Sequence, residues 1–98
     1  MTNDQYTGAI NSIGKTCFVR FYDILSDYKY SELEVQGVLR YQMGYTQGSC
    51  RIRTSASKKI IDEGVSDRVF RDVIASRSPK VSQETKLQAK FWLNQISN

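Results

Sequence analysis

The 98-residue sequence contains no histidine, only two cysteines and a single proline. Without histidine, neither a Ser-His-Asp nor a Cys-His catalytic set can be assembled. Two cysteines without histidine also fall short of the ligands that a structural zinc site needs. These absences remove much of enzyme chemistry. We therefore expect a binding protein with no catalytic residues, no metal ion and no cofactor.

Long apolar runs are missing as well. No run approaches the roughly 20 residues that cross a bilayer, and the first ten residues lack the basic start and apolar stretch of a secretory signal. We expect a cytoplasmic protein with no membrane partner, in which Cys17 and Cys50 remain buried free thiols. The chain has 40% apolar and 24% charged residues, which is a globular composition. It predicts one helical domain over residues 1–98, with residues 1–11 as a loose N-terminal arm.

The charge is unevenly distributed along the chain. Residues 1–50 hold four Lys or Arg and five Asp or Glu, whereas residues 51–98 hold ten and five. A basic second half predicts a polyanionic partner, with nucleic acid foremost. The alternative is an ordinary basic surface that keeps the protein soluble.

Capping residues and apolar periodicity predict an all-α fold, a compact bundle of about five short helices. The predicted helices cover residues 13–26, 32–43, 47–63, 67–76 and 83–96, capped by Ser12, Ser31, Thr46, Ser66 and Ser82. Residues 32–43 also alternate between apolar and polar at period two, so a strand is the alternative there. The capping box formed by Ser31 and Glu34, with Gly44 at the other end, favours the helix.

Residues 9–16, AINSIGKT, match a relaxed phosphate-loop pattern. A working phosphate loop follows a buried strand, and the polar residues before Ala9 do not predict one. The first glycine of the pattern is replaced by Ala9, and no apolar run ending in Asp follows to hold magnesium. We interpret the stretch as the start of a helix with Lys15 on its exposed side.

Residues 31–63 resemble the helix-turn-helix family, because Met43-Gly44-Tyr45-Thr46 forms a short glycine-containing turn between two predicted helices. The resemblance implies that the second helix enters the major groove of DNA. On that helix, Arg51, Thr54, Ser55 and Lys58 are predicted to share the outer face, with Gln47 and Ser49 at its start. Contacts to the phosphate backbone of the DNA are assigned to Lys59, Arg68 and Arg71.

Our first hypothesis is a small basic DNA-binding regulator with a helix-turn-helix-like core, in which DNA is favoured over RNA. The alternative is a protein-interaction module, such as a small inhibitor, adaptor or assembly subunit, that docks its basic half on an acidic partner. The last helix supports a partner, most simply a second copy of the chain, through Leu87, Phe91 and Trp92. Arg53 falls within the predicted apolar stripe, where it forms either a structural ion pair or a ligand contact.

Overall fold

The computed structural model describes residues 1–97, and every regular element in that part of the chain is an α-helix. The elements are α1 (Asn3–Ile13), α2 (Lys15–Arg20), α3 (Tyr22–Ser26), α4 (Glu32–Met43), α5 (Gln47–Asp62), α6 (Ser66–Ala75) and α7 (Gln83–Ser97). The predicted all-α fold is therefore confirmed. Residues 32–43 form helix α4, so the strand alternative is wrong.

The N-terminal segment differs most from the prediction, because the expected loose arm is helix α1. Thr2 and Gln5 form a capping box at its start, and Tyr6 and Ile10 bury their side chains. Ser12 lies inside α1 and donates a hydrogen bond to the carbonyl oxygen of Gly8, so it does not cap a following helix.

The predicted long helix over residues 13–26 is divided in the structure. Gly14 ends α1 with φ at 83°, and Phe21 separates α2 from α3. The unexpected helix α1 and the break at Phe21 each add one helix, which explains why residues 1–97 contain seven helices where about five were expected. Residues 9–13 are helical and no strand precedes them in the described chain, which excludes phosphate-loop geometry.

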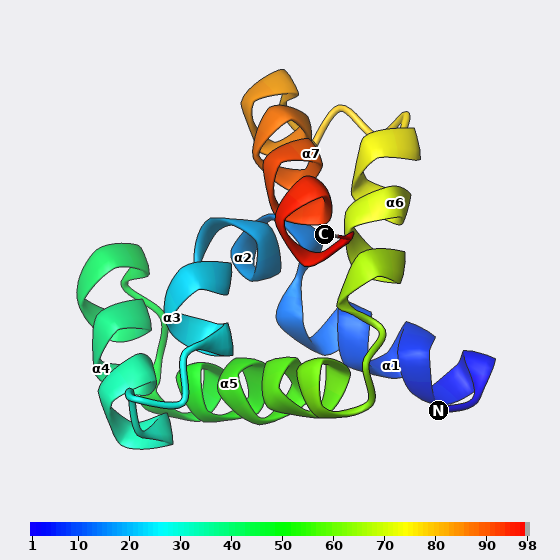
Figure 1. Cartoon of the computed structure of the whole chain (residues 1–98). Coiled ribbons are helices and arrows are strands. Elements are labelled where there is room, and N and C mark those ends of the chain that lie inside the picture. Colours follow the sequence, from blue (N-terminus) through cyan, green and yellow to red (C-terminus); the bar gives the residue numbers. More distant parts are fainter. Residues whose placement is uncertain (98) are drawn as a thin grey trace.

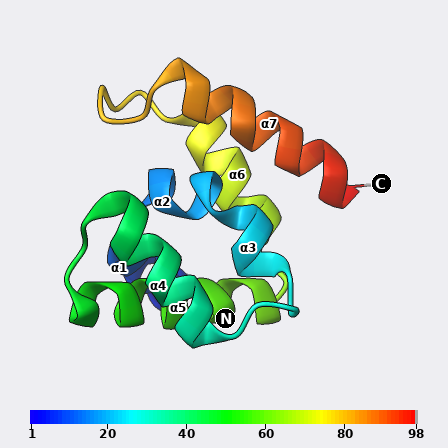
Figure 2. The same ribbon diagram turned by 90° about the vertical axis from the view of Figure 1, so that its left-hand side faces the viewer.

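The helices form two groups joined by the short helices α2 and α3 (Figures 1 and 2). Helices α1 and α4 pack against the long helix α5, and α6 packs against α7. Helix α2 contacts α6 and α7, while α3 contacts α5. The central position of α2 and α3 agrees with the burial of their large side chains, including Phe18 and Leu25.

An aromatic cluster occupies the core between α2, α3, α6 and α7. The rings of Phe18 and Phe70 are fully buried, with their centroids 5.7 Å apart. The ring of Tyr22 meets that of Phe70 edge-on, with the centroids 4.9 Å apart. It is tilted against the ring of Trp92, with the centroids 5.3 Å apart. Aromatic pairs at such separations add to the free energy gained by burying their area. The cluster fixes α7 against the centre of the molecule.

The N-terminal ends of α6 and α7 test two of the predicted N-caps. Ser82 accepts a hydrogen bond from the backbone N–H of Thr85 at 3.1 Å, so its role as a cap is confirmed. Ser66 is the first residue of α6, whose N-cap is Val65 without a side-chain hydrogen bond. The predicted cap at Ser66 is therefore wrong by one residue.

Candidate nucleic-acid interface

Helices α4 and α5 and the turn between them are defined by strong local signals. Ser31 and Glu34 form the predicted capping box of α4, and Gly44 ends it in the left-handed conformation with φ at 68°. Thr46 then caps α5 by accepting a hydrogen bond from the N–H of Ser49 at 3.2 Å. The two helices pack against each other and cross at a steep angle in Figure 1.

One side of α5 carries four of the predicted DNA contacts at four-residue intervals. Gln47, Arg51, Ser55 and Lys59 are all exposed. Residues spaced by four lie above one another on a helix, so these side chains form one continuous row. The row begins at the N-terminal end of α5, next to α4.

Helix α4 extends this row with two residues that the sequence analysis did not assign. Gln36 and Arg40 line a shallow surface hollow together with Gln47. Gln36 and Gln47 also line an adjacent hollow with Gly48 and Arg51. No carboxylate lines either hollow. The spacing of Gln36 and Arg40, one helical turn apart, was the signal that sequence reasoning overlooked.

Thr54 does not belong to the outer face of α5. Its side chain has 0% exposure, whereas the apolar side chain of Ile52 is 53% exposed. Cys50, Thr54, Ser57 and Ile60 form the buried side of the helix. The packing of α5 against α1, α3 and α4 decides which side is buried, and that side differs from the one that apolarity alone predicts. The prediction that Thr54 faces a DNA groove is wrong.

Two other predicted contacts bond within the protein. Ser49 accepts a hydrogen bond from Nε of Arg53 at 2.9 Å. Lys58 donates from Nζ to the carbonyl oxygen of Leu25 at 2.6 Å, near the end of α3. Carbonyl groups in the last turn of a helix lack intrahelical partners, so Lys58 stabilises the end of α3.

The two residues of α6 that were predicted to contact the DNA phosphates do not belong to the row on α5. Arg68 donates to Oδ1 of Asn3 at 2.6 Å, and its guanidinium lies 3.8 Å from the ring centroid of Tyr6. Arg71 pairs with Asp67 on the same helix. Both arginines therefore bond to neighbours on α1 or α6.

Arg53 has no carboxylate partner among the described residues, so the predicted ion pair is wrong. Its Nη1 donates to the carbonyl oxygen of Ile13 at 2.5 Å, and its guanidinium carbon lies 3.9 Å from the ring centroid of Tyr45. A backbone carbonyl, a hydroxyl and an aromatic face hold the half-buried guanidinium in place, with two of its five N–H donors used. Arg53 therefore has a structural role that joins α1, α5 and the turn after α4.

The side chains proposed for a partner interface on α7 divide into two groups. Leu87 and Phe91 are 64% and 54% exposed, one helical turn apart. Trp92 is half-buried and donates from Nε1 to the carbonyl oxygen of Val19 at 3.1 Å. Trp92 thus packs against the core, and of the three proposed residues Leu87 and Phe91 are the ones that form an exposed apolar stripe.

Both cysteines are buried and free, as predicted. Burial raises the pKa of the Cys17 thiol, although the nearby charge of Arg53 opposes that increase. Within residues 1–97, no cluster of three or more His, Cys, Asp or Glu side chains is arranged to hold a metal ion. No helix in the same range combines the length and apolarity needed to cross a membrane.

No protein-family model matches this sequence, and neither the curated proteins nor the solved structures provide a match.

Proposed function

We propose that the protein binds duplex DNA through α4, the turn at residues 44–46 and the exposed row on α5. The observation that carries this proposal is the row of Gln47, Arg51, Ser55 and Lys59, extended by Arg40 and lacking carboxylates in the hollows between the helices. In helix-turn-helix proteins, residues at the start of the second helix contact base edges. The chemistry of the row fits that arrangement.

Each side chain of the row has a role that follows from its donors and acceptors. Arg51 can donate two hydrogen bonds to a guanine, and Gln47 can pair with an adenine, because these are the geometries that base edges offer in the major groove. Arg40 and Lys59 supply positive charge for phosphates on either side. With 16 residues, α5 is about 24 Å long, which is sufficient to lie along the groove.

The decisive experiment measures duplex DNA affinity against salt concentration for the wild type and two arginine variants. Arg51→Ala should weaken binding at low salt and lower the slope of log K against log salt by about one. Arg71→Ala is the matched control, since Arg71 is exposed but paired with Asp67 on α6. It should leave both quantities close to the wild-type values. The proposal fails if the wild type does not bind duplex DNA at low ionic strength, or if Arg51→Ala binds it with wild-type affinity.

A second candidate function, protein interaction, is favoured by the exposed apolar stripe on α7. Leu87 and Phe91 lie four residues apart and together present a narrow apolar surface. A second copy of the chain is the simplest partner, because a two-fold axis would bring the same stripe of both copies together. Light scattering at micromolar concentration should then show a dimer that Leu87→Glu dissociates. Leu33→Glu, which changes a leucine on α4 that is 79% exposed, should leave the dimer intact. A monomeric wild type would exclude this candidate.

A further inference from the structure

A positively charged pocket lies on the other side of α5 from the proposed DNA surface. It has a volume of about 550 Å³ and is bounded by the α1–α2 junction, α5 and the segment between α6 and α7. Arg53, which lines this pocket, is about 200° around the helix from Arg51, given 3.6 residues per turn. The pocket is therefore distinct from the row that carries the proposed function.

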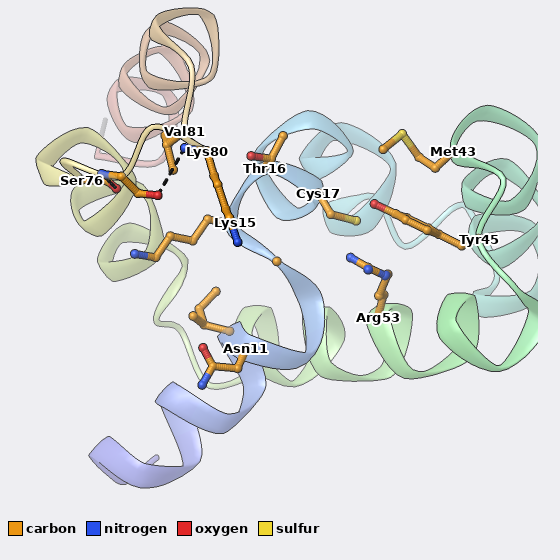
Figure 3. A pocket seen from close by; sticks show the side chains of 13 residues that line it. Asn11, Lys15, Thr16, Cys17, Met43, Tyr45, Arg53, Ser76, Lys80 and Val81 are labelled. Carbon is orange, nitrogen blue, oxygen red and sulfur yellow. Dashed lines mark hydrogen bonds between the residues drawn. The ribbon is translucent and has the colours of Figure 1, made fainter.

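Three cations from separate segments line the pocket. Lys15 comes from the start of α2, Arg53 from α5 and Lys80 from the segment before α7. In Figure 3 the Lys80 side chain reaches toward the α1–α2 junction, whereas the Lys15 side chain extends away from Arg53. No Asp or Glu lines the pocket, and the ion pairs found in residues 1–97 involve none of these three side chains. Like charges without a counter-charge repel one another, so an anion bound among them would relieve that repulsion.

Arg53 retains donors for such an anion. A guanidinium has five N–H donors, and the bonds of Arg53 to Ser49 and Ile13 use two of them. The remaining donors have no oxygen partner among the described residues and can serve a ligand in the pocket, where the Cys17 thiol also lies beside the guanidinium. Arg53 therefore holds the fold together and still offers charge to the pocket.

The wall opposite Arg53 supplies hydroxyl donors. Ser76 accepts a hydrogen bond from the N–H of Ser78 at 3.2 Å, and Ser78 accepts one from the N–H of Lys80 at 3.3 Å. Because each hydroxyl oxygen already accepts, its own O–H is free to donate to a ligand. Thr16 adds a third hydroxyl to the lining. This concentration of donors and positive charge suits a multiply charged anion with several oxygens.

The lining also has an apolar part, with Ile10, Met43 and Val81 beside the polar groups, which include the amide of Asn11. The volume lies within the range of roughly 300–1,000 Å³ that is typical of pockets for small organic molecules. An inorganic anion alone would leave the apolar part uncovered. A ligand that joins an anionic group to an organic group would use both parts of the pocket.

We propose that this pocket binds a small phosphate monoester, with the phosphate held between Arg53 and Lys80 and with Lys15 adding positive charge to the lining. Gly14, Lys15 and Thr16 of the AINSIGKT stretch line the pocket, although residues 9–13 of that stretch are helical and do not form a phosphate loop. The site is independent of the DNA-binding proposal, because it shares no residue with the row on α5.

The test follows backbone amide signals of the ¹⁵N-labelled full chain by NMR during titration with adenosine monophosphate, inorganic phosphate and adenosine. We expect both phosphate compounds to shift the signals of Gly14, Thr16 and Ser78, and adenosine to leave them unchanged. The double variant Lys15→Gln/Lys80→Gln should weaken binding of adenosine monophosphate by about tenfold or more, since it loses two charged hydrogen-bond donors. The control pair Lys29→Gln/Lys90→Gln removes the same charge at exposed positions outside the pocket and outside the row on α5, and should retain wild-type affinity.

Three results would overturn the proposal. The first is the absence of shifts at millimolar adenosine monophosphate in a folded wild type. The second is an equal loss of affinity in both double variants, because binding would then depend on net charge alone. The third is a response of these signals to duplex DNA but not to the small phosphate, which would assign the pocket to the nucleic-acid backbone.

Discussion

Arg53 donates a hydrogen bond from Nη1 to the carbonyl oxygen of Ile13, a residue 40 positions earlier, at 2.5 Å. Ile13 is the last residue of α1, where carbonyl groups have no partner within the helix. The same guanidinium stacks on Tyr45, in the turn that precedes α5. A single side chain thus holds together three segments that meet only in the folded protein.

The first prediction concerns this contact. Arg53→Met keeps an apolar stem of similar size but loses the hydrogen bond to Ile13 and the interaction with Tyr45. We expect the free energy of unfolding to fall by about 2–3 kcal/mol, as measured by urea denaturation. Arg53→Lys should recover only part of this loss, because an ammonium group lacks the flat face and the fork of donors. Equal stability of Arg53→Met and the wild type would contradict the structural role.

The second prediction compares two glycines at helix ends. Gly14 has φ 83° and ψ 130°, a region that L-residues avoid, whereas Gly44 has φ 68° and ψ 19°, close to the left-handed helical region. A Cβ at Gly14 would also lie 3.3 Å from Nη1 of Arg53. Thermal or urea unfolding should show that Gly44→Ala costs about 1 kcal/mol and Gly14→Ala about 2–3 kcal/mol. Similar costs for the two substitutions would show that the backbone at Gly14 relaxes.

Local signals in the sequence predicted some elements well. The capping box of Ser31 and Glu34 and the glycine at position 44 define α4, and Thr46 defines the start of α5. Each of these signals acts within one turn of its helix, so no knowledge of distant contacts is needed. Helix α1 has the same kind of signal at Thr2, but its polar composition concealed it. Its few apolar residues can be assigned to a buried face only when the packing of α1 against α5 is known.

Long-range packing decided what the sequence did not reveal. The inward side of α5 is defined by contact with α1, α3 and α4, which buries Thr54 and exposes Ile52. Apolarity alone predicts the opposite, with Ile52 buried and Thr54 exposed. The pocket lined by Lys15, Arg53 and Lys80 is a further example, because these three residues line one pocket only once three segments have packed.

The third prediction uses the unusual environment of Thr54. Its hydroxyl oxygen is buried and has no hydrogen-bond partner within the described residues. Thr54→Val replaces the hydroxyl with a methyl group of similar size and removes the cost of burying an unsatisfied polar group. We expect the protein to be stabilised by about 1 kcal/mol in urea denaturation, with unchanged DNA affinity. Ser55→Val is the control on the exposed side and should change stability little. A loss of stability in Thr54→Val would reveal a partner for the hydroxyl.

The fourth prediction concerns alkaline pH and the contact between α1 and α6. Tyr6 is 4% exposed and donates a hydrogen bond from its hydroxyl to Oδ2 of Asp72 at 2.5 Å. Burial, followed by the hydrogen bond to Asp72 and its negative charge, raises the pKa of Tyr6 well above its ordinary value near 10. The folded protein therefore holds this proton more tightly than the unfolded chain. The resulting stability is fully present below pH 10 and is lost as the pH rises beyond it.

Circular dichroism during urea denaturation at pH 8 and pH 11 measures this loss. We expect Tyr6→Phe to reduce stability by about 1 kcal/mol at pH 8, because the hydrogen bond is gone, and to lose less than the wild type between the two pH values. Tyr28→Phe is the control, since Tyr28 bonds Asp62 at 3.0 Å but is 73% exposed. The hydrogen bond to Asp62 also raises the pKa of Tyr28, but water screens an exposed pair, so this variant should keep nearly the wild-type pH dependence. An unchanged pH dependence in Tyr6→Phe would assign the alkaline loss of stability to other tyrosines or to lysines.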